Sequence, residues 1–108
     1  MPSYNPPLRD MQFVLHELLK VSDEFKLMPK HADLDADTVN AVLEEGGKFA
    51  AAELFPINAS GDREGCTLDL ATHSVKTPKG WKEAYAKYVE GRWPSLSSDP
   101  ELGGQGLP

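Results

Sequence analysis

The apolar residues near the start of the chain form a short helical stripe. Residues 1–9 are predicted to be an extended arm, because Pro6 and Pro7 disfavour helix in and before their own positions. Asp10 is a favourable N-cap, and the apolar residues behind it recur at i, i+3, i+4 and i+7, the period of one helix face. A helix of about three turns is marginal alone, so it needs a packing partner. Its stripe consists of Met11, Val14, Leu15 and Leu18.

A longer stripe predicts a second helix that begins at Asp35 or Asp37. Gly46 and Gly47 lie in its middle, where each glycine costs about 1 kcal/mol relative to alanine. We therefore expect another backbone to lie close against this pair. Pro56 is predicted to end the helix. The other members of the stripe are Val39, Val42, Leu43, Phe49, Ala50 and Leu54.

The last third of the chain predicts a loop, a brief strand and a third helix. Residues 58–72 are polar and rich in turn formers, and apolar positions between residues 68 and 75 fit a short extended pair. The third helix is predicted to open with Thr77 as its N-cap and to end at Gly91. Together the three helices predict an all-α fold, a short helical bundle. The third apolar face, which we expect to be core, consists of Trp81, Ala84, Tyr85, Tyr88 and Val89.

Charge and composition exclude several functions. The net charge of −6 argues against nucleic acid and anionic membrane as partners. Residues 33–69 hold nine acids and two bases, whereas residues 76–92 hold five bases and two acids, so an anion is expected to dock only on the latter. Cys66 is the single cysteine, and an apolar run of the roughly 20 residues that span a bilayer is missing. A cytoplasmic location is the expectation.

The end of the sequence suggests a larger protein. Natural termini commonly trail off in polar residues, whereas residues 102–108 are glycine-rich and apolar. We interpret Pro108 as a cut inside a longer sequence. The alternative is a natural frayed tail.

Acidic residues before the second helix fit part of a calcium loop. Asp33, Asp35, Asp37 and Glu44 occupy positions 1, 3, 5 and 12 of an EF-hand loop. Position 6 holds Thr38 where the sharp turn requires glycine. The favoured interpretation is that these acids stabilise the positive end of the second helix.

Two groups of histidine and cysteine residues have a partial likeness to known chemical sites. His16 and Glu17 begin like a zinc-protease motif, but the second histidine of that motif is missing, so no metal site is predicted. Cys66 and His73 are a conceivable nucleophile pair that has no evident orienting group. His16 is therefore expected to be a boundary histidine and Cys66 an ordinary thiol.

The third helix carries aromatic and basic residues. Trp81, Tyr85 and Tyr88 suit ring stacking on a ligand, but helical spacing favours core packing. Basic residues on the same segment suit an anion, although a solvated helix face is the commoner arrangement. These bases are Lys76, Lys79, Lys82, Lys87 and Arg92.

The glycine-rich end has some likeness to a phosphate-binding loop. Gly103, Gly104 and Gly106 give the required backbone freedom. A dinucleotide fingerprint also needs a strand before it and a helix after it, and the sequence predicts neither. A loop that another backbone or a ligand approaches closely is the simpler interpretation.

The order and spacing of several short motifs resemble the start of an acyl-CoA dehydrogenase. The likeness is to the larger bacterial type, which has an extra amino-terminal segment, and it runs over the whole chain. The motifs are Tyr4-Asn5-Pro6-Pro7-Leu8-Arg9-Asp10-Met11 with residues 13–15, then Asn58 with residues 61–66, then residues 77–85, 93–96 and 103–108.

The resemblance implies a division of the chain and a set of roles. Residues 1–34 would be an arm with the first helix, and residues 35–108 the truncated start of the family's amino-terminal helical domain. The family removes two hydrogens from an acyl-CoA thioester, with a carboxylate base and with FAD as hydride acceptor. Those groups lie downstream, so the resemblance implies neither catalytic nor cofactor-binding residues here, and no metal. It places Gly103, Gly104 and Gly106 at the edge of the substrate pocket.

The resemblance also implies partners. The full-length protein would bind FAD, an acyl-CoA substrate and an electron acceptor, and it would form a homo-oligomer, whereas this piece alone is expected to hold no cofactor and to be inactive. A free-standing helical interaction module is the alternative function. It requires Pro108 to be the true carboxy terminus.

Overall fold

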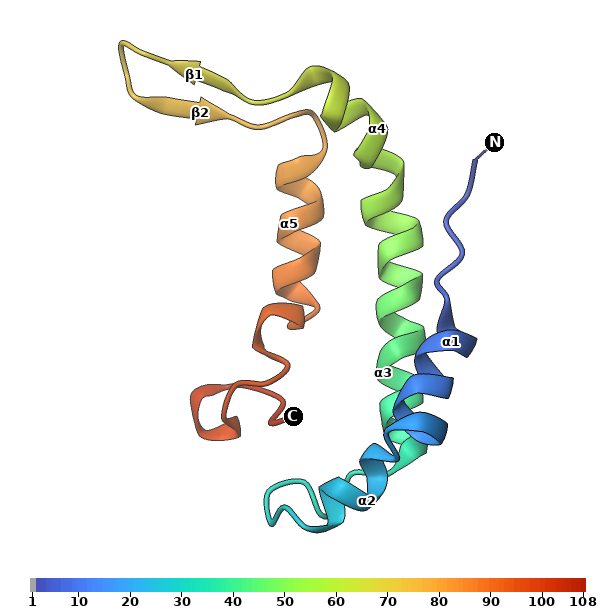
Figure 1. The fold of residues 1–108 in the computed structure, drawn as a ribbon. Coiled ribbons are helices and arrows are strands. Elements are labelled where there is room, and N and C mark those ends of the chain that lie inside the picture. The colour runs from blue at the N-terminus through green and yellow to red at the C-terminus, as the bar shows by residue number, and fades with distance from the viewer. Residues whose placement is uncertain (1) are drawn as a thin grey trace.

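In the computed structural model, which describes residues 2–108, one long helical rod is the main element, and the other segments lie beside it or extend from its end (Figure 1). Asp35 caps its start, because its carboxylate accepts a 2.8 Å hydrogen bond from the Thr38 backbone N–H. Gly65, at φ 69°, ends it. The rod spans about 43 Å at 1.5 Å per residue. Its continuous segments are α3 (Ala36–Phe49), a π-helical turn (Ala50–Leu54) and α4 (Phe55–Glu64).

Pro56 does not end the second helix, so that prediction is wrong. It lies in the first turn of α4, directly after the π-helical turn. A first-turn proline needs no hydrogen-bonded N–H, and the wider π-helical turn provides that position inside a continuous rod. Residues 58–64, predicted as loop, are therefore helical.

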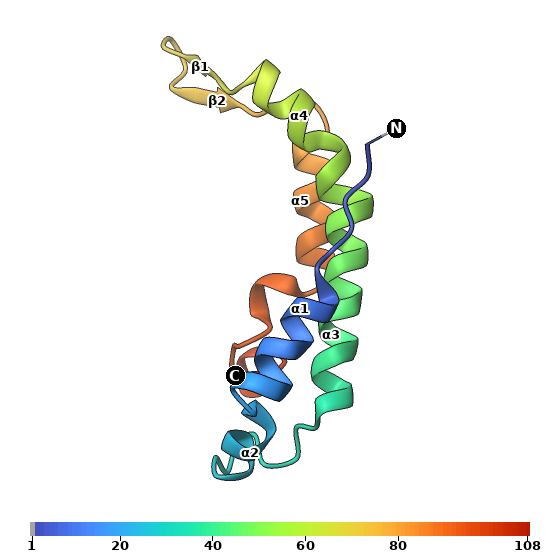
Figure 2. The ribbon, with the colours of Figure 1, turned by 45° about the vertical axis from the view of Figure 1, so that its right-hand side comes forward.

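The amino-terminal segments lie against the lower part of the rod (Figures 1 and 2). The first helix starts at Leu8 after Pro7, so Asp10 lies in its first turn and is not its N-cap. The arm approaches Gly47 so closely that a Cβ there would lie 3.0 Å from the Cβ of Pro6. A close approach at the glycine pair is therefore observed, but side chains make it, the Pro6 ring at Gly47 and the Trp93 ring at Gly46, and not the backbone that was predicted. The segments are α1 (Leu8–Gln12), a π-helical stretch (Phe13–Leu18) and α2 (Val21–Lys26).

A hairpin joins the rod to the last helix. Strands β1 (Thr67–Asp69) and β2 (Ser74–Lys76) pair in antiparallel fashion, with Leu68 opposite Val75. The hairpin projects away from the helices, and α5 (Trp81–Glu90) returns beside the rod (Figure 1).

The start of α5 differs from the prediction and its end agrees with it. Gly80, at φ 88°, precedes the helix, so Thr77 is not the N-cap. As an N-cap, Thr77 would accept a hydrogen bond from the Lys79 N–H, but that N–H donates to the Glu64 carboxylate at 3.0 Å instead. Gly91 is the C-cap, as predicted.

The glycine-rich end folds back on itself. Two 3-10 turns, Trp93–Ser95 and Pro100–Leu102, precede it. The Gln105 N–H then donates to the Ser95 carbonyl at 3.0 Å, and the Leu107 N–H donates to the Leu96 carbonyl at 2.9 Å.

The chain is far more open than a closed bundle. Its radius of gyration is 17.8 Å, whereas about 13 Å is expected of a compact domain of this length. Its accessible surface is 8309 Å², against about 5,900 Å² for a compact protein of this mass. The predicted helical character is confirmed, with the hairpin as the exception to all-α. Within residues 2–108 the buried positions are Gly47, Gly61, Pro78 and Ala84.

Candidate functional site

An apolar groove of about 380 Å³ runs between α4 and α5. The third helix was predicted to place its apolar face in a core, and the structure corrects this: Trp81, Tyr85 and Val89 are 42%, 66% and 49% exposed. Ala84 is the member of that face that is buried. The groove is lined by Leu54, Ile57, Asn58, Trp81, Ala84, Tyr85 and Tyr88.

Close packing along one side of α5 fixes the floor of this groove. The Trp81 indole lies directly against Gly61, where any Cβ would collide with the ring. Phe49 and Tyr88 continue the contact, with ring centroids 6.3 Å apart. The inner side of α5 is therefore packed against the rod, whereas Tyr85 and Val89 on its outer side stay exposed.

Two polar links hold the helices that flank the groove. Lys87 donates to the Glu53 carboxylate at 2.7 Å, an ion pair between α5 and the π-helical turn of the rod. At the other end, the Glu64 carboxylate accepts from the Lys79 backbone N–H. Among the predicted bases, Lys76, Lys79 and Lys82 form no ion pair within residues 2–108.

The glycines predicted at a substrate-pocket edge have local roles in the turn. Gly103 and Gly106 adopt φ values of 86° and 66°, which side-chain-bearing residues rarely reach. A Cβ on Gly104 would collide with the Ser98 carbonyl. Gly106 also borders an open polar cavity of about 640 Å³ that Lys30 and Asp99 flank at an ion-pair distance of 3.9 Å. The assignment of these glycines to a substrate pocket stays a prediction.

The glycine segment does not fit the phosphates of a flavin dinucleotide. It follows a 3-10 turn, and not the strand that such a loop requires. Its N–H groups already bond to the chain: Gly103 to the Pro100 carbonyl, and Gly104 to the Asp99 carbonyl, both at 3.0 Å. Donors that are taken in this way cannot cradle an anion.

The calcium-loop hypothesis is wrong, because the positions that should wrap an ion are helical. Asp37 and Glu44 lie within α3, and the Asp35 carboxylate is engaged as the N-cap. Side-chain and backbone hydrogen bonds from Thr38 lower the pKa of Asp35. Residues 2–108 contain no cluster of three potential metal-binding side chains. The capping interpretation holds for Asp35.

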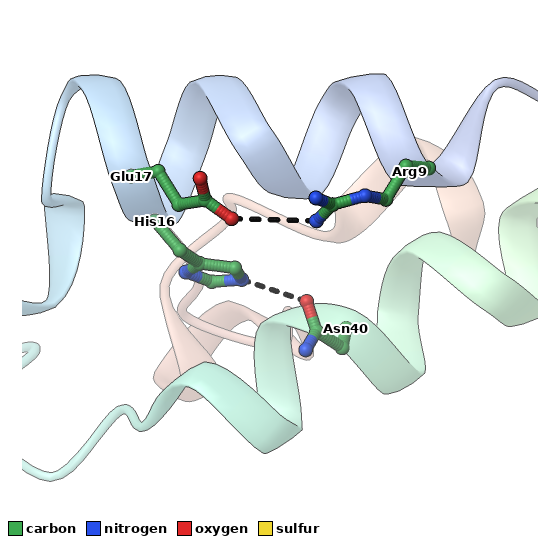
Figure 3. A network of polar contacts seen from close by, with 4 residues as sticks. All are labelled: Arg9, His16, Glu17 and Asn40. Atoms are coloured by element: carbon green, nitrogen blue, oxygen red, sulfur yellow. Dashed lines mark hydrogen bonds and ion pairs between the residues drawn. The ribbon is translucent and has the colours of Figure 1, made fainter.

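A small polar network joins the first helix to the rod (Figure 3). The His16 ring nitrogen Nε2 and the Asn40 Oδ1 are 2.7 Å apart, across 24 residues of sequence. Arg9 and Glu17 form an exposed ion pair at 3.3 Å beside it. His16 Nδ1 is buried and has no hydrogen-bond partner among the described residues. His16 is a half-buried boundary residue, as expected, but its partner Asn40 was not predicted.

Cys66 and His73 are kept apart by the hairpin. Cys66 precedes β1 at the base, whereas His73 lies in the turn that joins the two strands, at φ 56°. The structure therefore does not bring this pair together. In the same turn, hydrogen bonds from the backbone of Ala71 and Thr72 lower the pKa of Asp69.

Within residues 2–108, none of the helices combines the length and the apolar character needed to cross a bilayer.

Comparison with known proteins supports the family resemblance. No family model matches the chain. Over 106 residues, 98% of this chain, it is 35% identical to a 3-methylmercaptopropionyl-CoA dehydrogenase of Ruegeria pomeroyi. Over its whole length it is 32% identical to a broad-specificity linear acyl-CoA dehydrogenase, FadE5, of Mycobacterium tuberculosis. The chain spans 18% of the length of each of these relatives, which is consistent with an amino-terminal region. The resemblance to acyl-CoA dehydrogenases is thereby confirmed.

Proposed function

We propose that this chain is the amino-terminal helical part of a flavin-dependent acyl-CoA dehydrogenase and is not catalytic alone. The observation that carries the proposal is the 35% and 32% identity to two proteins named as acyl-CoA dehydrogenases, over practically the whole chain. The reaction would be α,β-dehydrogenation of an acyl-CoA thioester. The resemblance implies that a carboxylate base and FAD perform it, and we assign both to the part of the protein outside these 108 residues.

The physical character of the chain supports a structural role. Its net charge of −6 makes it a poor main surface for the polyanionic CoA group. Its accessible surface exceeds that of a compact protein of equal mass by about 2,400 Å². An excess of this size is typical of a segment that is completed by further protein.

Expression of the complete reading frame tests the proposal. The 108-residue chain should be colourless and inactive. The longer product should be yellow from bound flavin and should reduce an artificial electron acceptor when an acyl-CoA is added. A longer product that binds no flavin and stays inactive with a panel of acyl-CoAs would refute the proposal.

The remaining assignments follow from the same proposal. The full-length protein would be a cytoplasmic homo-oligomer that takes an acyl-CoA and an electron acceptor as partners. The competing function is a free-standing helical interaction module. A stop codon directly after Pro108 in the native gene would favour that module, and an open reading frame would favour the dehydrogenase.

A further inference from the structure

The outer edge of α5 carries an uncovered stripe. Lys82, Tyr85 and Val89 recur at i, i+3 and i+7, so they share one side of the helix beside the groove. Tyr85 and Val89 are among the exposed large apolar residues, and Leu54 is exposed on the facing helix. Tyr85 belongs to both the stripe and the groove lining, so the two surfaces adjoin.

The shape of this surface fits a helix. The groove lies between two helices whose side chains form ridges, and a third helix packs into such a depression through its own ridges. The ten residues of α5 extend over about 15 Å, enough for about three turns of a partner helix. A helix that fills such a groove presents apolar residues at i, i+3 or i+4, and i+7.

Charge adds a second requirement on the partner. Lys82 is exposed on the stripe and forms no ion pair within residues 2–108, whereas Lys87, on the inner side of α5, is paired with Glu53. A partner that carries a carboxylate beside its apolar stripe would meet the free ammonium group. The occupant is therefore an amphipathic helix with an acidic flank.

The spread of exposed apolar residues identifies the source of that helix. Besides the groove, such residues lie on the first helix (Phe13, Leu18), after α2 (Leu27) and on the hairpin (Leu70). A two-fold dimer covers one self-complementary patch on each copy, so it would leave the others bare. Further polypeptide covers several patches at once, and more than four fifths of the length of the relatives lies outside the matched region.

We infer that the groove between α4 and α5 is filled by an amphipathic, acid-flanked helix from the remaining part of the same polypeptide. This inference rests on the proposed function, because it needs a longer protein. It goes further by naming the surface, the residues that meet the partner and the chemistry of the helix that docks there.

Thiol labelling tests the inference in the product of the complete reading frame. The background is Cys66→Ser, which removes the exposed native thiol of this segment. Tyr85→Cys places a thiol in the groove, and Glu90→Cys places a matched thiol five residues on, away from it. Labelling at each position is measured by mass spectrometry of the peptide that contains it. In the 108-residue chain both thiols should label freely, and in the longer protein Tyr85→Cys should label at least about tenfold more slowly while Glu90→Cys stays fast.

Hydroxyl-radical footprinting of the unmutated protein repeats the measurement without a substitution. Oxidation of Trp81 and Tyr85 should fall in the longer protein relative to the 108-residue chain.

A charge reversal tests the role of Lys82 in the same labelling experiment. Lys82→Glu should partly restore labelling of the Tyr85→Cys thiol in the longer protein, whereas Glu90→Lys should not.

The possible outcomes distinguish a failure of the groove inference from a failure of the proposed function. A yellow, active protein whose Tyr85→Cys thiol labels as fast as in the 108-residue chain overturns the inference and keeps the proposed function. Slow labelling of the Tyr85→Cys thiol in a longer protein that has neither flavin nor activity refutes the proposed function, but it supports a helix docked in the groove. Protection that appears in the 108-residue chain and grows with its concentration assigns the groove to a second copy, which overturns the inference.

Discussion

The two ends of the helical rod differ in which residues cover them. At the α3 end, Gly47 receives Pro6, and Trp93 lies against Gly46 with its ring centroid 6.0 Å from that of Phe49. At the α4 end, the Trp81 indole lies against Gly61, but Trp81 and Tyr85 remain largely open to water. Where the chain packs on itself, a large residue meets a glycine. Where large apolar residues face one another across an open groove, no glycine contact closes the surface between them within residues 2–108, and this is the surface for which we propose a partner helix.

The largest effect is expected from a substitution at the well-packed α3 end of the rod. Trp93→Ala removes an indole that contacts Gly46 and Phe49, and it should lower the free energy of unfolding of the 108-residue chain by about 3 kcal/mol. Urea unfolding followed by circular dichroism at 222 nm measures the change.

Tyr85→Ala is the matched change at the open end. Because two thirds of Tyr85 is already exposed, this substitution should cost less than about 0.5 kcal/mol in the 108-residue chain. Equal losses for the two substitutions would contradict the difference between the ends.

The second prediction concerns the close contact between Gly61 of α4 and Trp81 of α5. Gly61→Leu puts a branched side chain where the Trp81 indole lies, and overpacking of this kind should cost about 2 kcal/mol. Trp81 fluorescence should shift to longer wavelength as the indole is displaced into water. Ser60→Leu, on the exposed neighbour, is the control and should leave both readouts nearly unchanged.

Periodicity predicted the helices because each keeps one apolar face, but it carries no information on what covers that face. The predicted α3 helix is confirmed for this reason, whereas the prediction that the aromatic face of α5 is core is wrong. The Gly91 cap was predicted separately, from the preference of glycine for helix ends. Pro56 was misjudged because a π-helical turn creates a first-turn position within a rod, which no local rule reveals. Glycine content predicted the backbone freedom that Gly103 and Gly106 use at positive φ, and their place at a substrate pocket stays a prediction. The His16–Asn40 pair needs a contact across 24 residues, which helical spacing alone cannot supply.

A third prediction concerns that pair, which lies at the well-packed end. Asn40→Ala removes the group that faces His16 Nε2 and leaves both ring nitrogens of a half-buried histidine without a partner in this chain. The loss should be about 1 kcal/mol. Asn58→Ala, on an exposed asparagine of the open groove, is the matched control and should stay within about 0.5 kcal/mol of the unmutated chain. A His16→Ala, Asn40→Ala double mutant that costs the sum of the two single changes would show that the contact contributes nothing.

The smallest effect is the pH dependence of the α3 cap. Hydrogen bonds from Thr38 hold the pKa of Asp35 below the value of about 3.9 that it has in an unfolded chain. A lowered pKa means that the folded state favours the carboxylate, so the stabilisation is fully present above about pH 3.9 and is lost as the pH falls through the folded pKa. The difference in midpoint temperature between the unmutated chain and Asp35→Ala should therefore be constant from pH 7 to 5 and should shrink below pH 4. Asp35→Asn keeps a neutral cap, so its own difference from Asp35→Ala should not change with pH. If the unmutated chain and Asp35→Asn show the same pH dependence of midpoint temperature relative to Asp35→Ala, the charge on Asp35 does not stabilise the start of the rod.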